Sequence, residues 1–161
     1  IIGVLSITGL GVKLTSLIIS ISDNNIWPAL LLTGLACLIL GMEVPTTAAY
    51  VICVSVAGPA LVDMGLGLLQ VHLFVFWFAL LSTITPPVCG TVFIAAGMVN
   101  ENWLKVSITS MSLGIGLYFI PLAMIANKSI LDLNTTVFLS LLAFVKIAVS
   151  LIMLSFSIIG N

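Results

Sequence analysis

Residues 82–90 read Ser-Thr-Ile-Thr-Pro-Pro-Val-Cys-Gly, in the middle of an apolar stretch that extends from residue 68 to residue 98. That stretch is about 31 residues long, whereas about 20 are enough for an α-helix to cross the hydrocarbon core of a bilayer. Two consecutive prolines remove two backbone N–H donors and crowd the preceding turn. The pattern predicts a helix broken at mid-membrane, with free carbonyls beside the hydroxyls of residues 82–85. The alternative is a single helix that is only kinked.

The composition indicates that this helix lies in a membrane. The chain is 61% hydrophobic and 6% charged, with a mean hydropathy of +1.40. Soluble domains carry about 25% charged residues, which cover their surface. A formal net charge of −1 offers no basic patch, so nucleic acid is not an expected partner. We therefore expect an all-α, multi-pass membrane protein with the lipid bilayer as a partner.

Residues 26–64 differ from the long apolar stretch 68–98, because each of their two apolar arms is too short to cross the bilayer core. The arms, 26–40 and 48–62, flank the polar break Gly-Met-Glu-Val-Pro-Thr-Thr at residues 41–47. Each arm makes about 22 Å of helix, less than the hydrocarbon core of about 30 Å. Acidic or amide residues at both outer ends indicate contact with water. The segment is predicted to be a re-entrant helical hairpin, or alternatively two short spans joined by an exposed turn.

The remaining segments are less distinctive. Residues 102–127 and 134–160 are each long enough to be ordinary spans. In the first of them, Gly114, Gly116 and Pro121 are candidate kink positions.

Residues 1–25 are predicted to be the end of a span followed by an interfacial arm helix, with Lys13 on its polar face. The alternative is one continuous, kinked span. Because Ile1 begins within an apolar run, residues 1–161 are expected to be a fragment with a single membrane domain.

Enzymatic motifs are not expected from this sequence. It contains neither His-Glu-x-x-His nor a glycine-flanked serine nucleophile, so no catalytic residue and no organic cofactor is assigned. His72, the only histidine, is predicted to lie near a wet helix end. The three cysteines are interpreted as small apolar fillers, and the tryptophans as interface and packing residues.

Two stretches carry a family resemblance. Residues 40–52, Leu-Gly-Met-Glu-Val-Pro-Thr-Thr-Ala-Ala-Tyr-Val-Ile, and residues 84–90, Ile-Thr-Pro-Pro-Val-Cys-Gly, resemble the large permease subunit of tripartite ATP-independent periplasmic (TRAP) transporters. The similarity is closest to the type in which the small and large membrane subunits are fused, and it covers roughly residues 1–127. Residues 134–160 resemble an added terminal span of that type.

The resemblance implies an activity and its partners. Such permeases import organic anions, commonly carboxylates, together with Na⁺ by an elevator motion, after delivery by a periplasmic substrate-binding protein. This chain would hold the second of two inverted repeats, the C-terminal portion of a permease in the bacterial inner membrane. Its further partners would be the first repeat and the small-subunit helices. The hairpin would enter from the periplasm.

The polar hairpin tip and the helix break together suggest where ion and substrate bind. A half-helix that ends in the membrane offers carbonyl oxygens to Na⁺, and one that begins there offers N–H groups to an anion. The predicted Na⁺ site consists of Gly41, Pro45, Thr46, Thr47, Ser82, Thr83, Thr85 and Pro86. The predicted substrate contacts are Thr46, Val88, Gly90 and Thr91.

Glu43 departs from the resembling sequences, which usually carry a small residue at this position. Its carboxylate could join the cation site or point into water at the extracellular mouth. We favour the second, because an anion beside an anionic substrate opposes binding.

Two other functions compete with this hypothesis. One is a dicarboxylate/sodium symporter that works without a binding protein. The other is a membrane scaffold subunit that transports nothing, in which the Pro-Pro break is only a kink.

Overall fold

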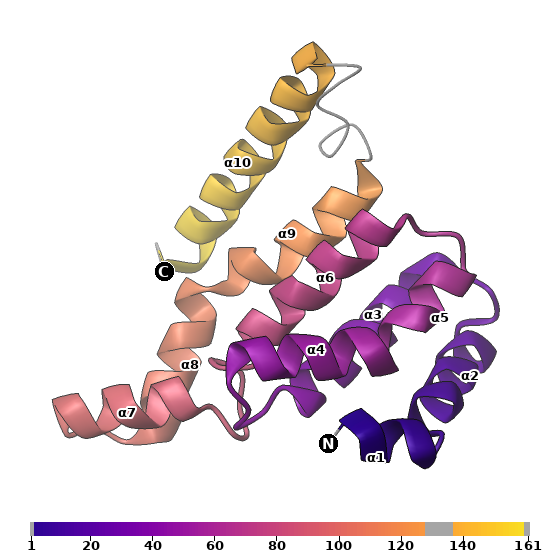
Figure 1. Ribbon diagram of the computed structural model, residues 1–161. Coiled ribbons are helices and arrows are strands. Elements are labelled where there is room, and N and C mark those ends of the chain that lie inside the picture. Colours follow the sequence, from indigo (N-terminus) through magenta and orange to yellow (C-terminus); the bar gives the residue numbers. More distant parts are fainter. Residues whose placement is uncertain (1, 128–136, 160–161) are drawn as a thin grey trace.

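The computed structural model describes residues 2–127 and 137–159, and the described chain is helical (Figure 1). The helices are α1 (Ile2–Ile7), α2 (Leu10–Ser22), α3 (Ile26–Leu40), α4 (Thr46–Val56), α5 (Gly58–Asp63), α6 (Leu68–Leu81), α7 (Gly90–Val99), α8 (Trp103–Leu113), α9 (Ile115–Ala126) and α10 (Val137–Ile159). No strand occurs in those two ranges.

Helices α3, α4 and α5 form a hairpin, in which α3 packs against both α4 and α5 and runs opposite to them (Figure 1). Asn25 begins α3, because its Oδ1 accepts a hydrogen bond of 3.2 Å from the Trp27 backbone N–H. The second arm is not the single helix expected from hydropathy, since it is interrupted at Ala57. Pro59 has no N–H to donate to the Ser55 carbonyl, which explains the interruption.

Helix α6 lies between the hairpin and α9, and contacts α3, α4, α5 and α9. Its buried side chains include Phe74, Val75 and Phe78. A Cβ at Gly34 of α3 would lie 2.9 Å from the Phe78 ring, so the absence of a side chain at Gly34 permits this close approach. The core of the described chain is therefore centred on α6.

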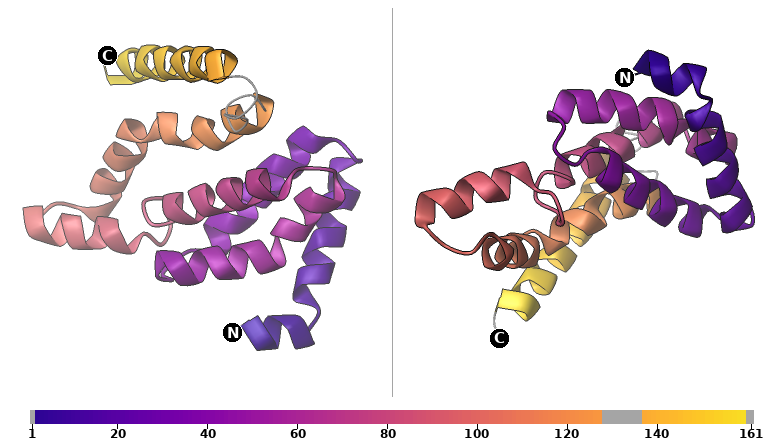
Figure 2. Two further views of the ribbon diagram at one scale, coloured as in Figure 1. Left: turned by 45° about the horizontal axis from the view of Figure 1, so that its top comes forward. Right: turned by 90° about the horizontal axis from the view of Figure 1, so that it is seen from below.

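After α6 the chain breaks over residues 82–89 and continues as α7, which lies at one end of the molecule and packs against α8 (Figure 2). The Pro86–Pro87 peptide bond within this break is cis. Residues 68–98 thus form two separate helices and not one kinked helix.

The predicted span 102–127 is bent by 41° between α8 and α9, at Gly114. Pro121 lies inside α9, and it deprives the Leu117 carbonyl of its helical donor. The Trp77 indole Nε1 of α6 supplies that donor, at 2.9 Å from the Leu117 carbonyl oxygen. A tryptophan predicted to serve packing therefore also satisfies a backbone group that the proline leaves free.

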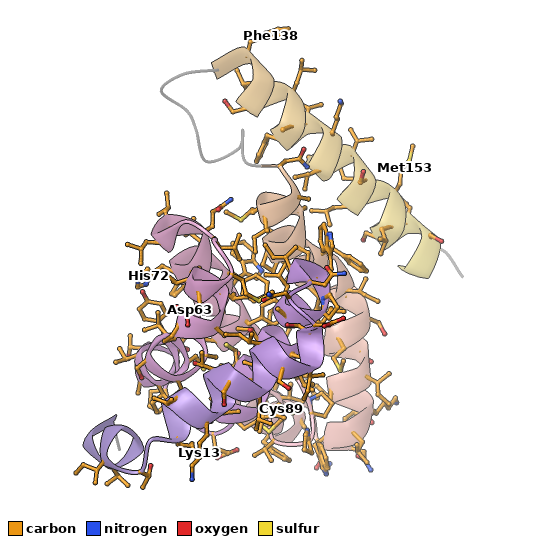
Figure 3. All side chains as sticks on the ribbon, turned by 90° about the vertical axis from the view of Figure 1, so that its right-hand side faces the viewer. Lys13, Asp63, His72, Cys89, Phe138 and Met153 are labelled. Carbon is orange, nitrogen blue, oxygen red and sulfur yellow. The ribbon has the colours of Figure 1, made fainter. Side chains whose placement is uncertain are left out.

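Helix α10 is the membrane-length helix of the described chain. Its window Ser140–Ser157 spans 18 residues with a mean hydropathy of 2.0, and the bent α8–α9 pair passes the same test when taken together. Phe138 and Met153 point away from the rest of the molecule, with 75% and 69% of their surfaces exposed (Figure 3). The helix thus presents an apolar face that water would not stabilise.

The first helices break where a glycine permits it. Gly9, between α1 and α2, has φ +65°, in the left-handed region that suits glycine. The segment is therefore two helices, as opposed to one continuous kinked helix. That α2 lies in the membrane interface stays a prediction.

Candidate ion and substrate site

The hairpin tip is seated directly on the end of α6. A Cβ added at Gly41, the residue that ends α3, would overlap the Ser82 Oγ, and both residues are buried. No other residue type fits at Gly41 without displacing one of the two segments. The fold therefore joins the two polar breaks that the sequence separates by some forty residues.

The hydroxyls of the break donate to carbonyls in the last turn of α6. Ser82 Oγ donates to the Ala79 carbonyl at 2.7 Å, and Thr83 Oγ1 to the Leu80 carbonyl at 2.8 Å. Thr85 Oγ1 donates to the Leu81 carbonyl at 2.6 Å. A hydroxyl whose proton is engaged in this way presents only lone pairs to any further partner, which suits a cation.

The two half-helices are tied together across the break. Thr91 Oγ1, in the first turn of α7, donates to the Thr83 carbonyl at 2.6 Å. The Thr83 carbonyl is the one that Pro87 deprives of a helical donor. Pro86 removes the corresponding donor from the Ser82 carbonyl, and no donor within the described ranges reaches that oxygen. The Ser82 carbonyl is therefore an available oxygen beside the tip.

Tyr118 was not found by the sequence analysis. Its phenol lies 2.7 Å from Thr85 Oγ1 and acts as the donor, because the Thr85 proton is engaged by Leu81. It fixes the break to α9 across 33 residues of sequence. One signal could have indicated it, since a phenol within an apolar segment must find a polar partner when buried.

Thr46 and Thr47, at the start of α4, line a groove beside α6 and not the break at residues 82–89. Together with Tyr50, Val51, Leu69, His72, Leu73 and Phe76, they line a groove of about 380 Å³ between α4 and α6. Their hydroxyls make no hydrogen bond to any other residue of the described ranges. Tyr50 OH and His72 Nδ1 share a hydrogen bond of 2.7 Å, so this half-buried histidine joins two helices.

The substrate contacts predicted at residues 88–91 surround the start of α7. Cys89 precedes α7 and is buried, and its side chain does not cap the helix. Its thiol lies 3.8 Å from Ser107 Oγ of α8. The first N–H groups of α7 thus have no side-chain cap and carry the positive end of the helix dipole. Pro45 stands in the same position before α4, again without a side-chain cap.

Glu43 faces α7. It lies in the left-handed region with φ +59°, and its Oε1 is 3.8 Å from the position of a Cβ on Gly90. The side chain is exposed and its carboxylate lies beside the start of α7; that it points into water at the extracellular mouth stays a prediction.

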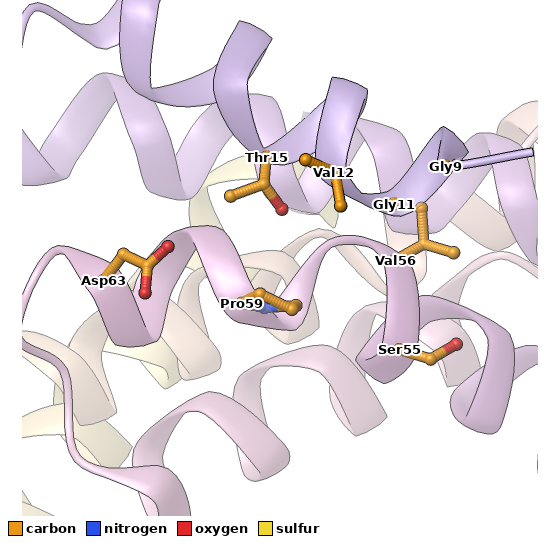
Figure 4. Close-up of a pocket in the computed structure, with 8 residues that line it drawn as sticks. All are labelled: Gly9, Gly11, Val12, Thr15, Ser55, Val56, Pro59 and Asp63. Carbon is orange, nitrogen blue, oxygen red and sulfur yellow. The ribbon is translucent and has the colours of Figure 1, made fainter. Parts of the chain in front are cut away.

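A separate cavity of about 410 Å³ lies between α2 and the α4–α5 arm (Figure 4). It is lined by Gly9, Gly11, Val12, Thr15, Ser55, Val56, Pro59 and Asp63. Thr15 Oγ1 is buried there without a partner in the described part of the chain. None of the predicted ion or substrate residues lines this cavity.

A hairpin tip seated on a broken helix, in a chain with a membrane-length apolar helix, is an arrangement typical of secondary-transporter permeases. Residues 1–139 match the family described as "Tripartite ATP-independent periplasmic transporter, DctM component". The chain belongs to this family of TRAP transporter permease components, which carry out transmembrane transport and are not enzymes. Its tripartite, periplasmic character implies a periplasmic binding protein as partner. No curated protein and no solved structure matches the chain.

Proposed function

We propose that this chain forms one half of the transport site of a Na⁺-coupled permease that imports organic anions, chiefly carboxylates, from a periplasmic binding protein. The single observation that carries the proposal is the seating of Gly41 on Ser82. It joins the end of α3 to the end of α6, and Thr91 at the start of α7 is bonded to the Thr83 carbonyl of the same break. Such convergence of half-helix ends is how secondary transporters build ion and substrate sites.

The Na⁺ site is assigned to the tip–break junction. Sodium prefers hard, neutral oxygen ligands, and the junction offers hydroxyl lone pairs of Ser82, Thr83 and Thr85. The Ser82 carbonyl adds a fourth oxygen. Gly41, Pro45 and Pro86 shape the backbone around them. Thr46 and Thr47 line the α4–α6 groove in this structure, and they are proposed to add their hydroxyls when the ion binds.

The substrate carboxylate is assigned to the start of α7, at Val88, Gly90 and Thr91, with Thr46 on the opposite side. The uncapped N–H groups of Gly90 and Thr91 offer hydrogen bonds, and the helix dipole favours negative charge there. Binding of Na⁺ on one side of the junction and of an anion on the other would neutralise both charges within the membrane.

The hairpin is proposed to be re-entrant from the periplasm and to form, with the broken helix, the second of two inverted repeats. Helix α10 extends beyond the matched residues 1–139, which supports the C-terminal portion of a fused small- and large-subunit chain. The first repeat and the small-subunit helices would complete the site in a bacterial inner membrane.

The test is uptake by the intact transporter, reconstituted with its binding protein and a panel of radiolabelled carboxylates, with and without a Na⁺ gradient. We expect uptake that requires both Na⁺ and the binding protein. Uptake that needs no binding protein would indicate a binding-protein-independent symporter instead. A correctly inserted transporter that takes up no carboxylate would contradict the proposal.

A further inference from the structure

The cavity between α2 and the α4–α5 arm is bordered by two polar groups that the fold leaves without partners. Thr15 Oγ1 is buried there and forms no hydrogen bond within the described part of the chain. Pro59 has no N–H to donate to the Ser55 carbonyl, and no other backbone N–H of the described ranges is bonded to that oxygen. Lipid supplies no such bonds, and buried polar groups in folded proteins almost always have a partner. The two unpaired oxygens therefore point to a bound ligand.

Both oxygens belong to the contact between α2 and the arm. A Cβ added at Gly11 would lie 3.4 Å from the Ser55 carbonyl oxygen, so this oxygen is directed at α2. The Ser55 hydroxyl is engaged elsewhere, because it donates to the Ile52 carbonyl at 2.9 Å. Thr15 stands one helical turn beyond Gly11 on the same face of α2. In Figure 4 it faces Pro59, with Ser55 and Asp63 on either side of that proline.

Asp63 gives the cavity its charge. Ser55, Pro59 and Asp63 are spaced four residues apart along the arm, so they share one face of it, and all three line the cavity. Asp63 is the ionisable residue among the lining residues, and Lys13 of α2 is not one of them. A carboxylate, a hydroxyl and a carbonyl are hard oxygen ligands of the kind that bind alkali and alkaline-earth cations. The ligand is therefore a cation and not an anion.

We propose that this cavity is a cation site, separate from the junction of hairpin tip and helix break, that binds one partly hydrated monovalent cation such as Na⁺. A single carboxylate with neutral oxygens balances one positive charge, whereas Ca²⁺ takes six to eight oxygens, several of them from carboxylates. The inference does not depend on transport or on ion binding at the junction.

The spacing of the ligands shows why the cation keeps some of its water. Ser55 and Asp63 are eight residues apart, about 12 Å along the arm at 1.5 Å per residue, so one bare ion cannot touch both. The cation lies between the Asp63 carboxylate and the Thr15 hydroxyl, and water joins it to the Ser55 carbonyl. A cavity of about 410 Å³ has room for several water molecules, each of which occupies about 30 Å³. A cation so placed ties α2 to the hairpin arm.

The test is equilibrium binding of radioactive ²²Na⁺ to the intact, purified transporter without substrate, with choline chloride holding the ionic strength constant. Asp63→Asn and Thr15→Val should each remove one bound Na⁺ per transporter, or raise the half-saturating concentration of that site by about tenfold. Two matched changes outside the cavity should leave binding unaltered. They are Asp23→Asn, at the exposed end of α2, and Ser16→Ala, whose hydroxyl is bonded to the Lys13 carbonyl.

Pro59→Ala tests the site without risk to the fold. It restores an N–H that can donate to the Ser55 carbonyl, and alanine favours a helix, so the variant should be at least as stable as the wild type. Na⁺ should bind more weakly, because the carbonyl is no longer open to the water that joins it to the ion. The loss should be smaller than in Asp63→Asn, which removes a charged ligand.

The proposal is overturned if Asp63→Asn, Thr15→Val and Pro59→Ala all bind Na⁺ as the wild type does, or if Asp23→Asn loses as much as Asp63→Asn. Displacement of this Na⁺ by an equal or lower concentration of Ca²⁺ would also overturn it, since the site would then be divalent. Thr85→Val at the junction should keep the cavity ion. If Thr85→Val binds as much Na⁺ as the wild type while the cavity variants lose one ion, the junction assignment fails and the cavity site stands.

Discussion

Gly41 and Ser82 touch, so that the tip of the α3–α4 hairpin rests on the end of α6 with no room for a side chain at Gly41. Ser82 is held in place by the last turn of α6, since its hydroxyl donates to the Ala79 carbonyl at 2.7 Å. The seating of the hairpin thus depends on the absence of one methyl group. This contact is the physical basis for placing the ion and the substrate at one junction.

Gly41→Ala should lift the tip from the break. The new Cβ would overlap Ser82, and overpacking of this kind costs typically about 1–3 kcal/mol. We expect a lower melting temperature in detergent and a marked loss of uptake. Combining the change with Ser82→Gly removes the obstructing atoms and should recover part of both.

Gly97→Ala is the matched control for that experiment. Gly97 lies within α7, and a Cβ there would meet no atom within 4 Å. The substitution should leave uptake unchanged and stabilise the helix slightly, by roughly 0.5–1 kcal/mol. A similar loss of uptake in both variants would contradict the specific role of Gly41.

Trp77→Phe should destabilise the contact between α6 and α9. It leaves the Leu117 carbonyl without a donor, and the loss of one hydrogen bond typically costs about 0.5–1.5 kcal/mol. Pro121→Ala restores a backbone N–H to that carbonyl, so the tryptophan change should cost less in the Pro121→Ala background. Thermal unfolding of the four variants of this cycle measures the coupling. Strictly additive effects would show that the indole does not satisfy that carbonyl.

The sequence analysis located the first hairpin arm and both polar breaks, because hydropathy and proline act locally. The arm expected at residues 26–40 is α3, and the break predicted around the two prolines separates α6 from α7. The interruption at Ala57 was missed, since Gly58 and Pro59 lie within a run that hydropathy scores as apolar throughout.

The pairings across the fold could not be predicted in the same way. Trp77 reaches Leu117 over 40 residues, and Tyr118 reaches Thr85 over 33. Neither spacing carries a periodic signal, because such contacts depend on how the helices pack. The bond from the Thr91 hydroxyl to the Thr83 carbonyl was missed for a similar reason, and the substrate contact predicted for Thr91 stays a prediction.

Cysteine labelling tests whether the hairpin is re-entrant. Asn24→Cys and Asp63→Cys stand at the exposed outer ends of the two arms, and both should react with a membrane-impermeant maleimide from the periplasm. Asn100→Cys, at the exposed end of α7, should react only from the cytoplasm. The native cysteines are buried, so their background should be low. Labelling of the first two positions from opposite faces would rule out the hairpin.

Tyr118→Phe separates positioning from ion binding. The change removes the donor to Thr85 Oγ1 but keeps the ring, and the loss of one hydrogen bond costs about 1 kcal/mol. If Tyr118 only positions the break, the maximal uptake rate should fall while the Na⁺ concentration for half-maximal uptake changes little. A large change in that concentration would instead assign Tyr118 to the ion site.

The Na⁺ dependence of uptake tests the central assignment most directly. In the intact transporter, Thr47→Val at the tip and Thr85→Val at the break should each raise the Na⁺ concentration for half-maximal uptake by about tenfold, which corresponds to roughly 1.4 kcal/mol of lost ion binding. Thr109→Val, which removes an exposed hydroxyl bonded to the Lys105 carbonyl on α8, should leave it unchanged. If Na⁺ activation is unchanged in both the tip and the break variants while uptake remains measurable, the ion does not bind at this junction.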